Sequence, residues 1–246
     1  YTKTDILAIP SRITSACGHA VPAMLHNEDG ARSSTGQYQM SESLIFNIFR
    51  IVVLLYSVVL HELAHGLTAR SMGDTTAERA GRLTLNPFPH LDLFGSVILP
   101  FITMSIGGFI FGYAKPVPYN PGSLNDRAYG PAKVAFAGPA VNVSLAVLFG
   151  LSVRFFGPFM SPVLVDMMGL VVWINLILAV FNLIPIPPLD GHWLLMTFLP
   201  ARYHVLKVAL YRYQWLLLVV CIFFIFPALV PLLGRAFMLL TGQRLF

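Results

Sequence analysis

The sequence predicts an all-α protein that crosses a membrane several times. Hydrophobic residues make up 56% of the 246-residue chain and charged residues only 11%, against roughly 25% charged residues in an average soluble domain. The mean hydropathy, +0.72, is correspondingly high. Apolar stretches near the roughly 20 residues that a spanning helix needs recur along the chain. These stretches cover residues 44–60, 94–112, 134–156, 163–186 and 215–240.

Residues 1–39 differ from the predicted membrane domain, which covers residues 40–246. They contain scattered Ser, Thr, Gly and Pro, no sustained apolar period, and no signal peptide in which a basic segment precedes an apolar one. Met40 opens a polar group with helix-capping chemistry directly before the first apolar stretch. Two explanations fit this polar leader: an upstream addition to a chain that begins at Met40, or a native flexible tail. Cys17 lies in the leader and Cys221 in a predicted span, so no disulfide framework is implied.

The basic residues indicate how the chain is oriented in the membrane. Although the formal net charge is +5, the Lys and Arg residues are spread among loops, so we expect no nucleic-acid partner. Loops rich in Lys and Arg lie on the cytoplasmic side. All three basic segments can do so only if residues 94–112 enter the membrane and return without crossing it, for which Pro100 and Gly107-Gly108 supply breaks. The alternative is that residues 94–112 form a plain span. The three segments contain Arg70, Arg79 and Arg82; Lys115, Arg127 and Lys133; and Arg202, Lys207 and Arg212.

The pattern His61-Glu62-Leu63-Ala64-His65 stands at the end of the first apolar stretch. Two imidazoles four residues apart project from one helical face about a turn apart, so both can hold one zinc ion. Between them, Glu62 can reach a water on that zinc and act as a general base. Ionisable side chains at membrane depth are unfavourable unless they are paired or liganded, so they indicate a function. The alternative for Glu62 is a structural ion pair with Arg70.

A catalytic zinc usually has three protein ligands and one open position. Asp190 is the best candidate for the third ligand, because the predicted topology brings the end of the fourth apolar stretch to the same side of the membrane as His65. The charges also balance, since a zinc dication with ionised Glu62 and Asp190 sums to neutrality in a low-dielectric site. We therefore expect one zinc ion per chain. His192, two residues beyond Asp190, is not expected to be a ligand.

Three segments carry a resemblance to a known family. They are His61-Glu62-Leu63-Ala64-His65, Ala137-Gly138-Pro139-Ala140-Val141-Asn142, and Asn182-Leu183-Ile184-Pro185 leading to Leu189-Asp190-Gly191. In this order they resemble the signature motifs of the site-2 protease family of intramembrane zinc metalloproteases. Two further stretches, residues 81–87 and 112–118, resemble the compact prokaryotic branch of that family. The resemblance covers about residues 44–195. It implies that His61, His65 and Asp190 bind zinc, that Glu62 is the general base, and that Asn142 and Asn182 line the site.

From the apolar stretches and the basic loops we expect a three-helix catalytic core with a re-entrant or hairpin segment and an additional C-terminal transmembrane helix. We expect Gly138-Pro139 to permit a kink or a close approach of helices rather than chemistry. For Asn142 and Asn182, hydrogen bonding between helices is an alternative to a role at the site.

The expected function is that of an intramembrane zinc metalloendopeptidase in a prokaryotic cell membrane, with its active site toward the cytoplasm. Its substrates would be transmembrane segments of membrane-anchored proteins, cut in regulated intramembrane proteolysis. Residues 115–119, where prolines disfavour a helix, could pair with the unwound substrate. One alternative is a non-proteolytic membrane chaperone or adaptor derived from the same fold. Another is a metal transporter, but the sequence has no evident repeated halves or path of intramembrane carboxylates.

Overall fold

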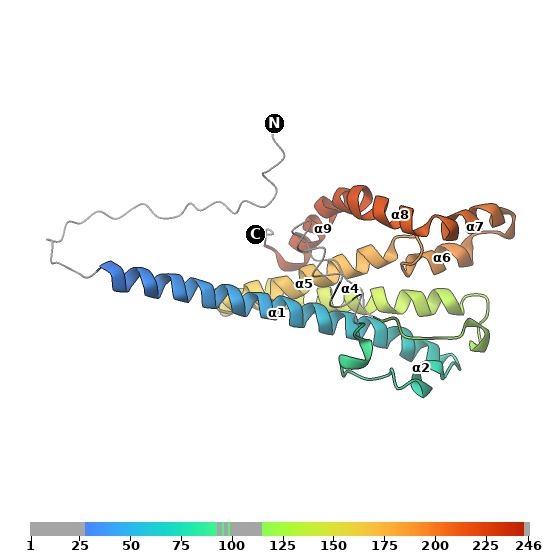
Figure 1. Cartoon of the computed structure of the whole chain (residues 1–246), viewed down its shortest axis with the longest axis horizontal. Helices are drawn as coiled ribbons and strands as arrows, with labels where there is room; N and C mark the ends of the chain where they lie inside the picture. Colours follow the sequence, from blue (N-terminus) through green and yellow to red (C-terminus); the bar gives the residue numbers. More distant parts are fainter. Residues whose placement is uncertain (1–27, 93–94, 96–97, 99–114, 244–246) are drawn as a thin grey trace. The chain divides into compact units, whose positions relative to one another are not determined.

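The computed structural model describes residues 28–92, 95, 98 and 115–243 (Figure 1). The chain divides into two units, Tyr1–Ser43 and Leu44–Phe246. Helix α1, Glu28–Ser71, begins in the first unit, and the candidate site lies wholly in the second. The expected re-entrant segment, residues 94–112, lies outside the described residues apart from Gly95 and Ile98.

Four helical segments among the described residues are long and apolar enough to cross a membrane. The prediction of an all-helical protein with several membrane spans is therefore confirmed. The first span is longer than its apolar stretch, because α1 continues past Leu60 to Ser71 and carries His61 and His65 within the helix. The four segments are Ile45–Ser71, Gly130–Phe159, Pro162–Leu183 and Gln214–Thr241.

Helices α4, Gly130–Phe156, and α5, Pro162–Leu183, form a hairpin and lie side by side (Figure 1). The short 3-10 helix η4, Gly157–Phe159, joins them. Proline in the first turn of both helices favours helix initiation there, where its missing N–H is not needed. Ser161 caps α5, since its side-chain oxygen accepts a hydrogen bond from the Leu164 N–H at 3.3 Å.

The C-terminal part of the chain contains short helices followed by the last span. The elements are α6, Gly191–Phe198; η5, Ala201–Tyr203; α7, His204–Arg212; α8, Gln214–Val220; the π-helical turn η6, Cys221–Ile225; and α9, Phe226–Thr241. A buried apolar cluster joins α9 to the hairpin through Ala146, Val172, Leu176, Leu233 and Phe237. This contact holds the last span against α4 and α5.

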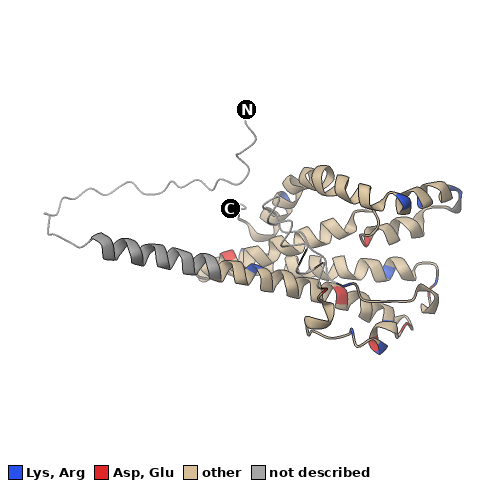
Figure 2. Ribbon diagram, viewed as in Figure 1, with Lys and Arg blue, Asp and Glu red and all other residues tan. Residues whose placement is uncertain are grey.

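The connection between α1 and α4 folds back so that its two ends meet. It contains α2, Thr76–Arg79, and the 3-10 helices η1, Phe88–His90, and η3, Pro121–Ser123. The Asn125 N–H donates to the carbonyl oxygen of Met72 at 2.8 Å, which ties the end of α1 to the segment that precedes α4. Figure 2 shows that charged residues lie mainly near the ends of the long helices and in their connections. This distribution is the one expected of helices whose middle portions face lipid.

Candidate metal centre

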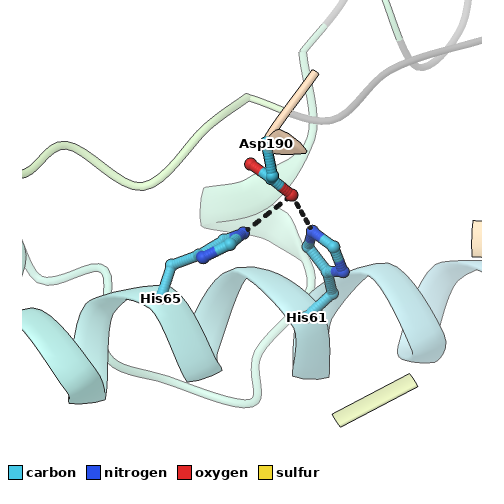
Figure 3. A group of neighbouring side chains, drawn as sticks. All are labelled: His61, His65 and Asp190. Atoms are coloured by element: carbon cyan, nitrogen blue, oxygen red, sulfur yellow. Dashed lines mark hydrogen bonds and ion pairs between the residues drawn. The ribbon is translucent and has the colours of Figure 1, made fainter. Parts of the chain in front are cut away.

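Three potential metal ligands meet between α1 and the residue that precedes α6. The Nε2 atoms of His61 and His65 lie 2.9 and 3.2 Å from the same oxygen, Oδ2 of Asp190 (Figure 3). One ligand atom from each residue lies within 4.8 Å of those from the other two. The two imidazole rings are nearly perpendicular, at 85°, so that both point toward the carboxylate. The structure thus brings together the three side chains that the sequence predicts as metal ligands.

The second nitrogen of each imidazole is already engaged. His65 Nδ1 lies 2.7 Å from the carbonyl oxygen of Val134, which can only accept, so Nδ1 carries the proton. His61 Nδ1 lies 2.5 Å from Oδ1 of Asn142, an arrangement that again puts the proton on Nδ1. In the neutral form that binds a metal, each ring presents an unprotonated Nε2 to the Asp190 carboxylate, and a cation between them would remove the repulsion between these lone pairs and the anion.

These donors fit a zinc ion. Nitrogen and carboxylate ligands, with the outer nitrogen of each histidine bound to an acceptor, are the usual surroundings of zinc. His65 Nε2 is buried, and its contact with Asp190 Oδ2 at 3.2 Å does not have the geometry of a hydrogen bond. A metal ion would supply the missing partner of this nitrogen.

Gly138 on α4 leaves the space beside the imidazoles open. A β-carbon at this position would lie 2.5 Å from His65 Nε2 and 2.6 Å from His61 Nε2. The sequence predicts that this glycine permits a close approach of helices. In the structure it permits a close approach of α4 to the two histidine side chains. A second glycine, Gly191, lets the backbone beside Asp190 pack against the carbonyl group of Leu183, where a β-carbon would collide.

Glu62 lies on α1 between the two histidines. Its Oε2 accepts a hydrogen bond from the Val117 N–H at 2.8 Å. The alternative ion pair with Arg70 is wrong, because Arg70 pairs with Glu78 at 2.9 Å. Glu62 is therefore held by the backbone of residues 115–120, which we call the strap.

Arg82 fixes the strap at its beginning. Its side chain is buried and donates from Nη2 to the carbonyl oxygens of Lys115 at 2.6 Å and Pro116 at 3.4 Å. The Lys115 N–H donates to the carbonyl oxygen of His90 at 2.9 Å. These contacts position Val117, and through it the Glu62 carboxylate.

Asp74 fixes the other end of the strap. Its buried carboxylate accepts hydrogen bonds from the Asn120 N–H at 2.6 Å, and from the Thr76 N–H and hydroxyl at 3.0 and 2.5 Å. Burial raises the pKa of the Asp74 carboxyl, but these hydrogen bonds stabilise its charged form and hold the pKa below its usual range. Asp74 thus joins the end of α1 to the strap as an anion.

The two asparagines expected at the site differ in their contacts. Asn142 is fully buried and contacts His61, whereas Asn182 donates from Nδ2 to the carbonyl oxygen of Leu178, one turn earlier in α5, at 3.0 Å. Asn142 Nδ2 is also engaged, since it donates to Oδ1 of Asn175 at 2.8 Å. Asn175 is not among the residues predicted from the sequence, although an asparagine within an apolar span is a signal that could have identified it.

Two aromatic side chains lie near Asp190 without belonging to the cluster. His192 donates from Nδ1 to the carbonyl oxygen of Leu189 at 2.6 Å, so its ring faces this carbonyl. The ring of Tyr119 packs 6.1 Å from that of Trp193, and its buried hydroxyl has no hydrogen-bond partner among the described residues. Burial and the nearby Asp190 carboxylate raise the pKa of Tyr119.

Comparison with known proteins identifies the family. The family model of Peptidase family M50 matches residues 49–159 and 158–226. The chain is 37% identical over 159 residues to YwhC of Bacillus subtilis, provisionally named a zinc metalloprotease, and the match covers 62% of this chain and 69% of that protein. It is 34% identical over 187 residues to Rip2 of Mycolicibacterium smegmatis, which is also provisionally named a zinc metalloprotease. That match covers 74% of this chain and 69% of Rip2.

A third relative, from the archaeon Methanocaldococcus jannaschii, is also provisionally named a zinc metalloprotease. It is 31% identical over 149 residues, and the match covers 61% of this chain and 70% of the relative. No solved structure matches the chain. The chain belongs to Peptidase family M50, the site-2 protease family, and is an intramembrane zinc metalloprotease.

Proposed function

We propose that His61, His65 and Asp190 hold one zinc ion and that Glu62 is the general base in the hydrolysis of a peptide bond. The observation that carries this proposal is the convergence of three ligand atoms within 4.8 Å. The engagement of both Nδ1 atoms supports it, because the two Nε2 lone pairs are left for the metal.

The chemistry divides between the metal and Glu62. When bound, zinc lowers the pKa of a coordinated water toward about 7 and polarises the scissile carbonyl. Glu62 takes the proton from the attacking water and later passes it to the departing amine. The Val117 N–H, which donates to Oε2, would hold the carboxylate in place while it moves the proton.

A hydrogen-bond donor beside the metal site would stabilise the negative charge that develops on the scissile carbonyl oxygen. Asn182 is the proposed donor of the two asparagines, because Nδ2 of Asn142 already donates to Asn175 and the Asn142 oxygen faces His61. A turn of Asn182 away from the Leu178 carbonyl would free its amide for the substrate. Asn142 then orients a ligand and does not contact the substrate.

The proposed substrates are transmembrane segments of membrane-anchored proteins, cut in regulated intramembrane proteolysis. A helical substrate must unwind before attack, because its scissile amide is engaged in helix hydrogen bonds. The strap is the proposed partner of the unwound segment, since its Val117 N–H donates a hydrogen bond to Glu62 and its Pro118 is exposed. A photocrosslinker at Pro118 should capture a bound model substrate, and no crosslink at any strap position would contradict this assignment.

The proposed location is a prokaryotic cell membrane, with the metal centre toward the cytoplasm. Support comes from the relatives, which are bacterial and archaeal, and from Arg79 and Arg212, which lie in α2 and α7 at the same end of the helices (Figure 1). A single cysteine at Arg212, in a chain without Cys17 and Cys221, should be labelled by a membrane-impermeant maleimide only after cells are opened. Labelling of Arg212→Cys in intact cells would show the opposite orientation, with the metal centre away from the cytoplasm.

The decisive experiment compares zinc content and cleavage of a single-span substrate in the purified protein. Glu62→Gln should retain zinc and lose cleavage by about 10²- to 10⁴-fold. Asp190→Ala should lose zinc, whereas His192→Ala, the neighbouring control, should retain it. Zinc in the unchanged protein without cleavage of any membrane substrate would favour the non-proteolytic chaperone or adaptor. Loss of zinc in His192→Ala but not in Asp190→Ala would overturn the ligand assignment.

A further inference from the structure

A network of hydrogen-bonded, buried polar side chains connects three helices next to the metal centre. Ser57 on α1, Asn142 on α4 and Asn175 on α5 are 4%, 0% and 0% exposed. Asn142 Nδ2 donates to Asn175 Oδ1 at 2.8 Å, and Asn175 Nδ2 donates to the Ser57 hydroxyl at 2.9 Å. The network reaches the metal centre at His61, whose Nδ1 lies 2.5 Å from Asn142 Oδ1.

Two backbone carbonyls set the direction of these hydrogen bonds: that of Ser57, which accepts from Asn142 Nδ2 at 3.4 Å, and that of Val171. The carbonyl oxygen of Val171 can only accept, and it accepts from Asn175 Nδ2 at 2.9 Å. Asn175 Oδ1 must therefore face Asn142, and it attracts the Nδ2 end of that amide. Asn142 then turns Oδ1 toward His61, so the imidazole must carry its proton on Nδ1 and present an unprotonated Nε2 to the metal.

His65 needs no such relay, because its Nδ1 donates directly to the carbonyl oxygen of Val134. Asn142 is different, because an amide can rotate and present either a donor or an acceptor. If its Nδ2 faced His61, the proton of the imidazole would move to Nε2, and this tautomer cannot bind a metal through Nε2. Two acceptors oppose this rotation, and Asn175 Oδ1 at 2.8 Å from Asn142 Nδ2 is the nearer of them, against 3.4 Å for the Ser57 carbonyl oxygen.

We propose that Asn175, supported by Ser57, is a positioning residue that locks the metal-binding tautomer of His61 through Asn142. This inference rests on the proposed role of His61 as a zinc ligand. It assigns a function in zinc binding to a residue in the middle of α5 that does not touch the metal centre. A purely structural asparagine between helices would contribute to stability and leave zinc affinity unchanged.

The test measures zinc affinity by competition with a chelator, together with thermal stability, on the full chain in detergent. Asn175→Leu removes the amide at similar volume and should weaken zinc binding by about 10- to 100-fold, the usual effect of losing a partner of a ligand. Asn175→Ala should give the same result, and it serves if the leucine variant does not fold. The control is Ser144→Leu, which removes a polar side chain of α4 whose hydroxyl donates to the carbonyl oxygen of Ala140 one turn earlier, and it should keep the zinc affinity of the unchanged protein.

A second variant separates positioning from stability. Asn142→Asp offers an acceptor to His61 from either oxygen, so it does not depend on Asn175 for its orientation. The double variant Asn142→Asp, Asn175→Leu should therefore regain most of the lost zinc affinity without regaining stability. Wild-type zinc affinity in Asn175→Leu, or no recovery in the double variant, would overturn the proposal. Retention of zinc by His61→Ala would instead overturn the ligand assignment itself.

Discussion

Gly138 faces His61 so closely that a β-carbon built on the glycine would lie 2.6 Å from Nε2 of the imidazole. We predict that Gly138→Ala folds but loses zinc, because the methyl group would occupy the space between the two histidines. The expected fall in zinc affinity is on the order of 100-fold or more, at or beyond the upper end of the effect of losing a partner of a ligand. Metal analysis after dialysis against a weak chelator would measure it.

Two other glycines control for the effect of the added methyl group. Gly150→Ala, also on α4, would place a β-carbon 2.8 Å from that of Leu240, so it should lower stability and retain zinc. Gly234→Ala on α9 would meet nothing within 4 Å and should change neither property. If Gly138→Ala binds zinc as tightly as Gly150→Ala does, the metal does not lie between the histidines.

Arg82→Met should impair catalysis without removing zinc. The buried guanidinium holds the carbonyl groups of Lys115 and Pro116, and the strap in turn holds Glu62 through the Val117 N–H. A misplaced base lowers kcat, and a shift of about 1 Å can reduce the rate on the order of 100-fold. We expect kcat to fall by about 10- to 100-fold with one zinc retained, measured on a single-span substrate.

The control for this change is Arg70→Met, which removes an arginine whose pair with Glu78 is half-exposed at the surface. Exposed pairs contribute little, about 0–1 kcal/mol, so Arg70→Met should leave kcat and stability nearly unchanged. Equal kcat in the two variants would show that the strap does not position Glu62.

The metal cluster was predictable because two of its three potential ligands lie within five consecutive residues of the sequence. Histidines at i and i+4 share a helical face whatever surrounds the helix, so His61 and His65 could be paired without a structure. Asp190 followed from the alternation of apolar stretches and from the family motif that contains it. The end of α1 was less predictable, since an apolar run marks depth in the membrane and not the end of a helix, which continues to Ser71.

The supporting contacts could not be predicted, because they join residues far apart in sequence. Asn175 and Ser57 are separated by 118 positions, and Val117 and Glu62 by 55. A polar residue in an apolar span announces that it has a partner but not which one. Whether Asn142 or Asn182 meets a histidine likewise depends on the rotation of two helices, which one sequence does not specify.

Tyr119→Phe tests an unpartnered buried group. The Tyr119 hydroxyl is buried without a hydrogen-bond partner among the described residues, while its ring packs against Trp193. Phenylalanine keeps the ring and removes the unsatisfied oxygen, so the free energy of unfolding should stay equal or rise by about 1 kcal/mol. Thermal unfolding in detergent would measure the change, with Tyr129→Phe at an exposed position as the control. A marked fall in Tm would mean that the hydroxyl donates to a partner in solution.

Asp74→Asn should lower stability in a way that depends on pH. The ionised carboxylate accepts from Asn120 on one oxygen and from Thr76 on the other, and asparagine can accept on only one side. At neutral pH we expect a loss of about 1–3 kcal/mol, the usual effect of leaving a buried group unsatisfied.

Because the pKa of Asp74 is lower in the folded protein than in the unfolded chain, its stabilising effect is complete well above the ordinary value of about 3.9. The effect is lost as the pH falls from there through the lower folded pKa. The difference in free energy of unfolding between Asp74→Asn and the unchanged protein should therefore narrow between pH 5 and pH 3, and other carboxylates cancel because both proteins contain them. Denaturant titrations at about pH 7, 5 and 3 would measure this difference, and a gap of constant size would show that Asp74 does not act as an anion.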